Sequence, residues 1–301
     1  MPSSPIVVVG SSNTDMVVQS DHLPAPGETV LGGAFSLHPG GKGANQAVAA
    51  ARLGGNVTFV ARVGDDLFGR QAREGFAAAG IDVATVVTDA KAASGVALIM
   101  VDAAGENSIS VALGANDRLA PADVDAAEDQ LRRAGFVLTQ LETPLATVEH
   151  LGRRAGELGY QLVLNPAPAR ELSDELLGAV SILTPNAIEA ELLSGISVTD
   201  EASARRAAAA LRKRGPATVI ITMGAAGAYV LSDELDERVP TRKVKVVDTT
   251  AAGDTFNGAL VVALAEGRDL RSAIVFANQA AAYSVGILGA QASAPCRADL
   301  G

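Results

Sequence analysis

The sequence has almost none of the residues from which disulfides and zinc centres are built. Among its 301 residues there is one cysteine, Cys296, with three histidines and no tryptophan. A lone cysteine excludes a disulfide within the chain and is typical of a reducing compartment, so we expect a cytoplasmic protein. The histidines are His22, His38 and His150. They are scattered, which argues against a dedicated zinc cluster.

Positive charge and long apolar runs are also scarce. Lysine and arginine number 24 against 34 acidic residues, which gives a formal net charge of -10. Such a chain repels the phosphate backbone of nucleic acids, so we expect no nucleic-acid partner. No apolar run approaches the roughly 20 residues that cross a bilayer. The first run, Ile6-Val9, has no charged segment before it and is typical of a strand, so we expect neither a membrane segment nor a signal peptide.

The chain does contain a repeated alternation of short β-branched runs and alanine-rich helical stretches. Ile6-Val9 ends at Gly10 and predicts a buried strand. Further predicted strands lie at 57–63, 136–140, 161–164, 182–184 and 217–222. Helices are predicted between them and, near the end, at 253–266 and 269–285. This order predicts an α/β protein with a mostly parallel central sheet and helices on both faces.

Two regions interrupt this alternation. Residues 11–38 carry turn signals with short extended pieces, and residues 93–112 have the pattern of a hairpin. Neither region contains a helix that could cover a parallel strand. We therefore expect the two regions to form one small antiparallel β-sheet that projects from the main domain. Ordinary surface hairpins are the alternative.

A small-residue turn lies between an expected strand and an expected helix at residues 246–260. Its sequence is Val-Val-Asp-Thr-Thr-Ala-Ala-Gly-Asp-Thr-Phe-Asn-Gly-Ala-Leu. The N–H groups in the first turn of a helix lack helical partners and carry partial positive charge, so small residues there let an anion approach. Asp254 falls in this turn, where its carboxylate could take a proton from an attacking hydroxyl. A lone aspartate at such a position more often only caps the helix.

A second glycine motif occupies residues 39–55, Pro-Gly-Gly-Lys-Gly-Ala-Asn-Gln-Ala-Val-Ala-Ala-Ala-Arg-Leu-Gly-Gly. It is not a Walker A loop, because a glycine stands where that motif needs serine or threonine. We expect a tight loop that brings backbone N–H groups, Lys42 and Asn45 together as donors to a sugar. Asp15 and Glu142 follow predicted strands and would supply carboxylate acceptors for its hydroxyls. Taken singly, Lys42 or Glu142 would more often be a solvated surface charge.

Together the two motifs resemble the ribokinase-like carbohydrate kinase family, also called the phosphofructokinase B family. The resemblance extends over essentially the whole chain. Further matching segments are Gly-Ser-Ser-Asn-Thr-Asp at 10–15, Pro-Gly-Glu-Thr-Val at 26–30, Gln-Leu-Glu-Thr-Pro-Leu at 140–145, Leu-Asn-Pro-Ala-Pro-Ala-Arg at 164–170 and Thr-Pro-Asn-Ala-Ile-Glu-Ala-Glu at 184–191. The resemblance implies a three-layer ribokinase-like α/β fold in one domain, residues 1–301, with the small β-sheet of 11–38 and 93–112 as a lid.

The resemblance also implies a role for each matched position. An anion hole would be formed by Ala251, Ala252 and Gly253, with Asp254 as the base. The sugar would be held by Asn13, Asp15, Gly41, Lys42, Asn45, Glu142 and Asp254. Asn186 and Glu189 would lie near the phosphates of ATP and a Mg2+ ion. The nucleotide would contact Thr222, Gly224, Gly227 and Asn278. Many family members have glycine where Ala251 stands.

The family further implies a potassium ion, K+, beside the anion hole. The positions that match its ligands are Asp248, Thr250, Ser284, Ile287, Gly289 and Ser293. Ile287 replaces a basic residue that is often found there, but it would contribute its backbone carbonyl.

The implied reaction transfers a phosphoryl group from ATP to the 5-hydroxyl of D-ribose, and the implied assembly is a homodimer. One alternative is a kinase of the same fold that acts on another sugar or on a nucleoside. Another is a catalytically silent sugar-binding regulator, against which Asp254 and its small-residue anion hole argue. A nicotinamide oxidoreductase is disfavoured because no G-x-G-x-x-G follows the first strand.

Overall fold

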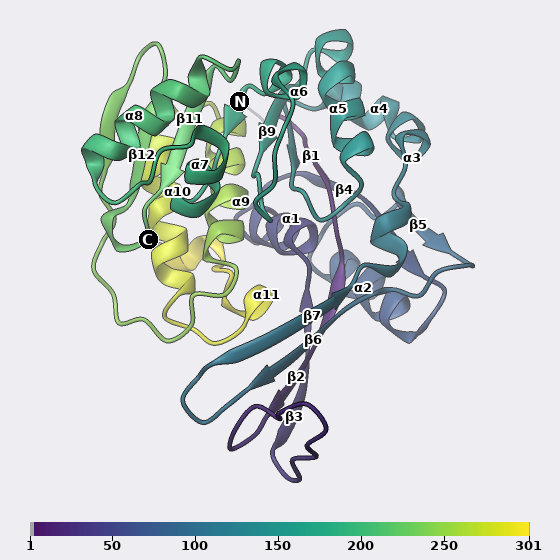
Figure 1. Cartoon of the computed structure of the whole chain (residues 1–301). Helices are drawn as coiled ribbons and strands as arrows, with labels where there is room; N and C mark the ends of the chain where they lie inside the picture. The colour runs from purple at the N-terminus through teal and green to yellow at the C-terminus, as the bar shows by residue number, and fades with distance from the viewer. Residues whose placement is uncertain (1–2, 301) are drawn as a thin grey trace.

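Residues 3–300, which the computed structural model describes, form two β-sheets (Figure 1). The larger sheet has nine strands. In sheet order they are β13 (Asp236–Val239), β12 (Ala228–Leu231), β11 (Thr218–Thr222), β10 (Ile182–Leu183), β9 (Gln161–Leu164), β8 (Phe136–Thr139), β1 (Ile6–Val9), β4 (Val57–Gly64) and β5 (Val86–Asp89). The strands from β11 to β5 are parallel, and β12 and β13 add an antiparallel hairpin at one edge. The expected mostly parallel sheet is confirmed.

Helices cover both faces of this sheet because the side chains of each strand alternate between two cores. In β1, Ile6 and Val8 face one core, whereas Val7 and Val9 face the other. The first core contains α1 (Lys42–Arg52), α2 (Leu67–Ala78), α9 (Ala252–Ala265) and α10 (Leu270–Ser284). The second contains α3 (Pro121–Ala126), α4 (Glu128–Arg133), α5 (Leu145–Leu158), α6 (Asp174–Ala179), α7 (Ala187–Ser194) and α8 (Glu201–Arg212). No helix within residues 3–300 is long and apolar enough to cross a membrane.

The smaller sheet has four strands and projects from the main body (Figure 1). In sheet order they are β3 (Ala34–Gly40), β2 (Asn13–Gln19), β6 (Gly95–Val101) and β7 (Asn107–Ala112). The two outer pairs are antiparallel as expected, whereas the central pair, β2 and β6, is parallel. The sheet is therefore mixed. The reason is connectivity. β2 continues from the C-terminal end of β1, and β6 follows the C-terminal end of β5. Because β1 and β5 run in the same direction in the main sheet, β2 and β6 leave it in the same direction.

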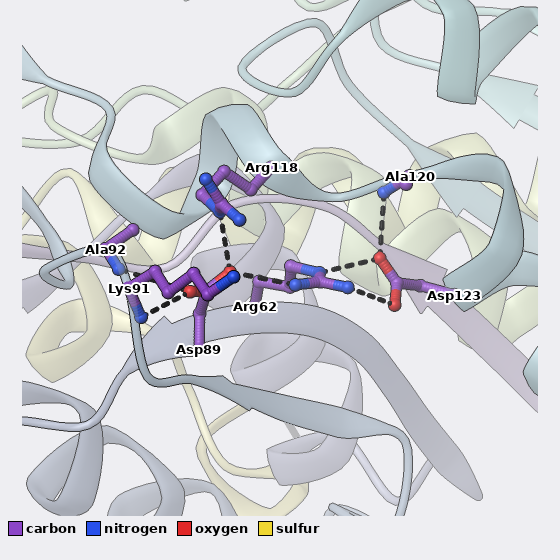
Figure 2. A network of polar contacts seen from close by, with 7 residues as sticks. All are labelled: Arg62, Asp89, Lys91, Ala92, Arg118, Ala120 and Asp123. Atoms are coloured by element: carbon purple, nitrogen blue, oxygen red, sulfur yellow. Dashed lines mark hydrogen bonds and ion pairs between the residues drawn. The ribbon is translucent and has the colours of Figure 1, made fainter.

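Ion pairs and hydrogen bonds join the larger sheet to the segments on either side of the β6–β7 hairpin (Figure 2). The buried carboxylate of Asp89, at the end of β5, accepts hydrogen bonds from Arg62 in β4 and from Arg118 in the 3-10 helix η1 (Gly114–Arg118), each at 2.8 Å. The Lys91 backbone N–H and Arg118 together lower the pKa of Asp89 to about 2. Arg62 also binds Asp123 through two bonds of 2.7 and 2.8 Å. The network thus ties both ends of the β6–β7 hairpin to the main sheet.

The structure differs from the sequence-based prediction before Asp248. We expected a strand there, and that expectation is wrong: residues 241–247 form no strand. Val246 and Val247 are exposed, and only the N–H groups of Val247 and Asp248 pair, with the carbonyl of Val285. Three short helical turns complete the fold: η2 (Gly224–Ala226), α11 (Ala290–Ser293) and η3 (Arg297–Leu300).

Candidate active site

The two glycine motifs meet at a single buried carboxylate. Asp254, in the first turn of α9, is 6% exposed. One of its oxygens accepts a hydrogen bond from Nδ2 of Asn45, and the other accepts one from Nε2 of Gln46, each at 3.0 Å. Both donors lie in α1, so helices α1 and α9 hold this carboxylate between them. Sequence reasoning assigned Asn45 to the site and left Gln46 without a role.

The surroundings of Asp254 increase its basicity. Burial raises the pKa of its carboxyl group, Glu142 adds to this effect, and Lys42, Asn45 and Gln46 oppose it. Taken alone, the helix N-terminus would favour the ionised carboxylate and so make a weak base. The net shift is upward, which makes the carboxylate a stronger acceptor for a proton than an ordinary aspartate.

Lys42 lies close to three carboxylates of the site. Burial disfavours its charge, but the nearby carboxylates of Asp254, Glu142 and Glu189 outweigh burial, so the pKa of Lys42 is raised. Its backbone N–H donates to Oε2 of Glu142 at 2.9 Å, and the hydroxyl of Ser11 donates to the same oxygen at 2.6 Å. An ammonium group among three carboxylates can hold both a sugar hydroxyl and a phosphate.

The glycine loop before α1 lets β2 approach closely. Gly41 has φ of 88°, and a Cβ there would lie 2.7 Å from the backbone nitrogen of Asn13. A Cβ on Gly40 would overlap the carboxylate of Asp15. The two glycines therefore allow Asp15 to lie against the loop. Burial, with Glu142 adding to it, raises the pKa of Asp15 to about 6.

Asn13 is held in place by a residue that sequence reasoning missed. Its Oδ1 accepts a 2.7 Å hydrogen bond from Nδ2 of Asn116, which lies fully buried in η1. Asn116 also bonds the backbone N–H of Ser12 at 2.8 Å and its carbonyl at 3.1 Å. A Cβ on Gly95 would overlap both amides. Asn116 therefore fixes the point at which β1 passes into β2.

The start of α9 has the geometry of an anion site. Ala251 is its N-cap and has φ of 57°, a left-handed conformation that no other non-glycine residue among 3–300 adopts. No side chain caps the helix. The N–H groups of Gly253 and Asp254 fall in the first turn, where a helix supplies no acceptor. They therefore remain available to a phosphate group, as the motif predicts.

A cavity of about 470 Å³ adjoins this helix start. Four sequence-predicted residues line it: Thr222, Gly224, Gly227 and Asn278. Ala252 and Gly253 of the anion site line it as well, and much of the remaining wall is apolar, including Phe256 and Ala281. Asn278 also has a structural contact, because its Nδ2 donates to the carbonyl of Val239 at 3.0 Å. The cavity has the size of a small-ligand site.

Asn186 and Glu189 lie outside the lining of this cavity and cap α7. Oδ1 of Asn186 accepts from the N–H of Glu189 at 2.9 Å, and Oε2 of Glu189 accepts from the N–H of Asn186 at 2.8 Å. Burial raises the pKa of Glu189, and Lys42 opposes the shift. Because each carboxylate oxygen has two lone pairs, Glu189 keeps acceptor capacity for a metal ion or its water ligands beside Lys42.

The predicted potassium ligands lie in two segments, 248–250 and 284–293, and a hydrogen bond between Asp248 and Gly289 joins them. The carboxylate of Asp248 accepts from the N–H of Gly289 at 2.8 Å and from the hydroxyl of Thr250 at 2.6 Å. The hydroxyls of Ser284 and Ser293 are fully buried and donate only to nearby carbonyls, which leaves their oxygens free to accept. Ile287 is 37% exposed, and the ligand that it would offer is its backbone carbonyl. This all-oxygen donor set fits a hard cation.

Comparison with known proteins identifies the class to which this fold and site belong. The chain belongs to the pfkB family of carbohydrate kinases, whose model matches residues 3–297. It is 45% identical over 294 residues to a ribokinase of Haemophilus influenzae, covering 98% of this chain and 96% of that protein. It is 38% identical to a deoxyribokinase of Salmonella typhi, covering 96% and 95%.

Solved structures show the same fold. The structure of Arabidopsis thaliana ribokinase complexed with ribose and ATP matches with a TM-score of 0.90 at 32% identity, covering 99% of this chain and 97% of that one. The expected ribokinase-like fold and family are thereby confirmed.

Proposed function

We propose that this chain transfers the γ-phosphoryl group of ATP to the 5-hydroxyl of D-ribose, giving D-ribose 5-phosphate and ADP. The observation that carries the proposal is the buried carboxylate of Asp254, which lies between polar sugar-side donors and a helix start that opens on the cavity. The 45% identical Haemophilus influenzae ribokinase supports ribose as the substrate.

The sugar side provides matched donors and acceptors for a small ring of hydroxyls. Asp15 and Glu142 accept, and Lys42 donates. Asn13 and Asn45 can do both. Oδ1 of Asn45 has no partner within the described residues, which leaves an acceptor for a sugar hydroxyl. A site with preformed partners for each hydroxyl discriminates strongly against analogues that lack one.

The transfer step uses Asp254 as general base. The 5-oxygen of ribose attacks the γ-phosphorus, its proton passes to the Asp254 carboxylate, and the bond to the β-phosphate oxygen breaks as ADP leaves. The N–H groups left available at the start of α9 stabilise the charge on the transferred group, and Lys42 neutralises it from the other side. Asn186 and Glu189 would lie near the phosphates, where Glu189 could bind the magnesium ion or its water ligands and the metal would supply further charge neutralisation. The adenosine part of ATP occupies the cavity near Asn278.

The remaining elements of the proposal concern the potassium ion, the smaller sheet, the assembly and the compartment. Potassium would stabilise the loops at 248–250 and 284–293, next to the anion site. The smaller sheet would act as a lid that excludes water from the transfer, with the whole chain as one domain. Several large apolar side chains are exposed on one face of this sheet: Val18, Phe35, Leu37, Leu98 and Met100. Such a patch suits a second copy of the chain, so we propose a homodimer. The single cysteine suits the cytoplasm.

The proposal is tested by incubating the purified chain with ribose, ATP and magnesium and measuring ADP release, with the product identified by mass and by phosphorus NMR. We expect ribose-dependent ADP release and a phosphate on carbon 5. Parallel assays in KCl and NaCl at equal ionic strength test the potassium site, and the rate should be higher in KCl. ATP hydrolysis that is independent of sugar, or no ADP release at all, would contradict the proposed activity.

A further inference from the structure

Gln46 contacts the proposed base directly and is itself fixed from three directions. Its side chain is fully buried in α1. Nε2 donates to Asp254 at 3.0 Å and to Oδ1 of Asn165 at 3.1 Å, and Oε1 accepts from Nε2 of Gln140 at 2.5 Å. Every polar atom of this side chain is therefore bonded to a residue from another part of the chain.

Asp254 and Asn165 determine which end of the Gln46 amide faces the carboxylate. The carboxylate of Asp254 can only accept, and Oδ1 of Asn165 faces Gln46 because Nδ2 of Asn165 donates to the carbonyl of Thr184. The reversed orientation would bring two acceptors together at both partners, and Gln140 donates to the remaining Gln46 oxygen. Gly10 leaves the space for this arrangement, because a Cβ there would overlap Oε1 of Gln140.

A second arm of the network returns to the backbone next to the base. Nδ2 of Asn165 donates to the carbonyl of Thr184 at 3.1 Å, and the hydroxyl of Thr184 donates to Oδ1 of Asn257 at 2.6 Å. Nδ2 of Asn257 then donates to the carbonyl of Gly253 at 2.8 Å. The chain of contacts therefore begins at the Asp254 carboxylate and ends at the residue before it. Buried networks of this kind fix one geometry because each unmade bond is costly.

We infer that Gln46 is a positioning residue for the reaction: it orients the Asp254 carboxylate and stabilises its ionised form, and the hydrogen bond from Gln140 helps to hold Gln46 in place. The inference rests on the proposed function, in which Asp254 accepts the proton of the sugar hydroxyl. Three charged groups also act on Asp254: Lys42 from α1, Glu142 from the loop after β8, and Glu189 from α7. Substitution of Gln46 leaves all three charges in place, so any change in titration can be assigned to the lost hydrogen bond.

The test is Gln46→Met, which keeps the length of the side chain and removes its hydrogen bonds. We expect kcat at saturating ribose to fall about tenfold to a hundredfold, the usual effect of losing a hydrogen bond to a charged group. The acid limb of kcat against pH should move upward by about one unit, because the carboxylate loses a stabilising donor. Removal of a bond to the base should change the KM for ribose much less than kcat.

Gln140→Met provides a second test without touching Asp254. It should move the acid limb in the same direction by a smaller amount, since Gln46 stays bonded to Asp254 but loses the donor that holds its oxygen. The double variant should be no worse than Gln46→Met alone, because both changes break the same path. Gln71→Met is the matched control: Gln71 lies exposed on α2, outside the network, and should show the wild-type pH profile.

Each result supports or overturns the inference. A lower Tm with an unmoved acid limb would mean that Gln46 only fills space, and the inference would be overturned. If Gln46→Met does not fold, the acid limb of kcat against pH is measured in Gln140→Met instead. An unmoved limb in that variant would overturn the inference. An Asp254→Asn variant assayed alongside separates the two claims. If it retains activity, the proposed base is wrong. If it is inactive while Gln46→Met has a normal profile, only the positioning role fails.

Discussion

The sugar side and the nucleotide side of Asp254 are built from different kinds of residue. On the sugar side, buried charged and amide groups bond to partners from distant elements, and the pKa values of Asp15, Lys42 and Asp254 are all raised. On the nucleotide side, mainly small and apolar residues, joined by Arg242 and Lys243, line a cavity of about 470 Å³. Preformed polar partners select hydroxyls, whereas apolar walls select mainly by shape. Substitutions on the two sides should therefore have different kinetic signatures.

The largest effect is expected at the boundary between the two sides. Asp254→Asn keeps the shape of the side chain but cannot take a proton, so kcat should fall by roughly 10²–10⁴. The affinities for ribose and ATP should change much less, because the lost interaction matters in the transition state. Steady-state kinetics with separate ligand-binding measurements check this. If Asp254 only capped α9, asparagine would replace it well, and more than about a tenth of the activity would remain.

A dependence on pH should appear on the sugar side alone. Asp15 accepts hydroxyl hydrogen bonds as a carboxylate, and its pKa is raised to about 6, so lowering the pH protonates it and removes an acceptor. We expect the affinity for ribose, measured by equilibrium binding, to fall about tenfold between pH 7 and pH 5, while the affinity for ATP stays constant. The same decline in Asp15→Asn, relative to its own affinity at pH 7, would assign the titration to another group.

A moderate effect is expected from Asn116, which contacts no proposed ligand. Asn116→Ala removes the hydrogen bond to Asn13, and we expect KM for ribose to rise about fivefold, the usual effect of one such bond. KM for ATP should not change. Asn278→Ala in the cavity is the opposite control, because it should raise KM for ATP and leave ribose unaffected. Equal shifts in both constants for either variant would show that the two sides are not separable.

The smallest effect concerns the backbone where the sides meet. The left-handed conformation of Ala251 costs an L-residue about 1–2 kcal/mol, part of which glycine would lose again in entropy. Ala251→Gly should therefore raise the free energy of unfolding by about 0.5–1 kcal/mol and leave kcat within about twofold. Chemical denaturation measures the first and steady-state kinetics the second. A less stable variant would mean that the methyl group of Ala251 contributes packing that outweighs the strain.

The sequence predicted the parallel core well because its strands are short continuous apolar runs. The strand at 161–164 was predicted with its observed bounds. The edge hairpin β12–β13 was missed, since Asp236–Val239 consists of three charged residues followed by one valine and becomes a strand only through pairing with β12. The parallel pairing of β2 with β6 likewise depends on where each strand leaves the main sheet.

The candidate site was predictable where a residue's own chemistry is informative. Asp254, Lys42 and Asn45 lie in glycine-rich motifs whose local geometry suggests an anion or a sugar. Gln46, Gln140 and Asn116 gave no comparable signal. Their importance comes from partners about 100 to 200 positions away in the sequence, which only the fold brings into contact.

The most direct test of the proposed reaction is a competition between sugars. Ribose, 2-deoxyribose, fructose and adenosine are supplied together at equal concentrations with limiting ATP, and the phosphorylated products are quantified by mass spectrometry. The ratio of products gives the ratio of kcat/KM values. A sugar side built from Asp15, Asn13 and Asn45 should grip adjacent hydroxyls, so ribose 5-phosphate should exceed every other product by at least about tenfold. A larger amount of 2-deoxyribose phosphate, fructose phosphate or adenosine monophosphate would contradict the assignment of ribose as the substrate.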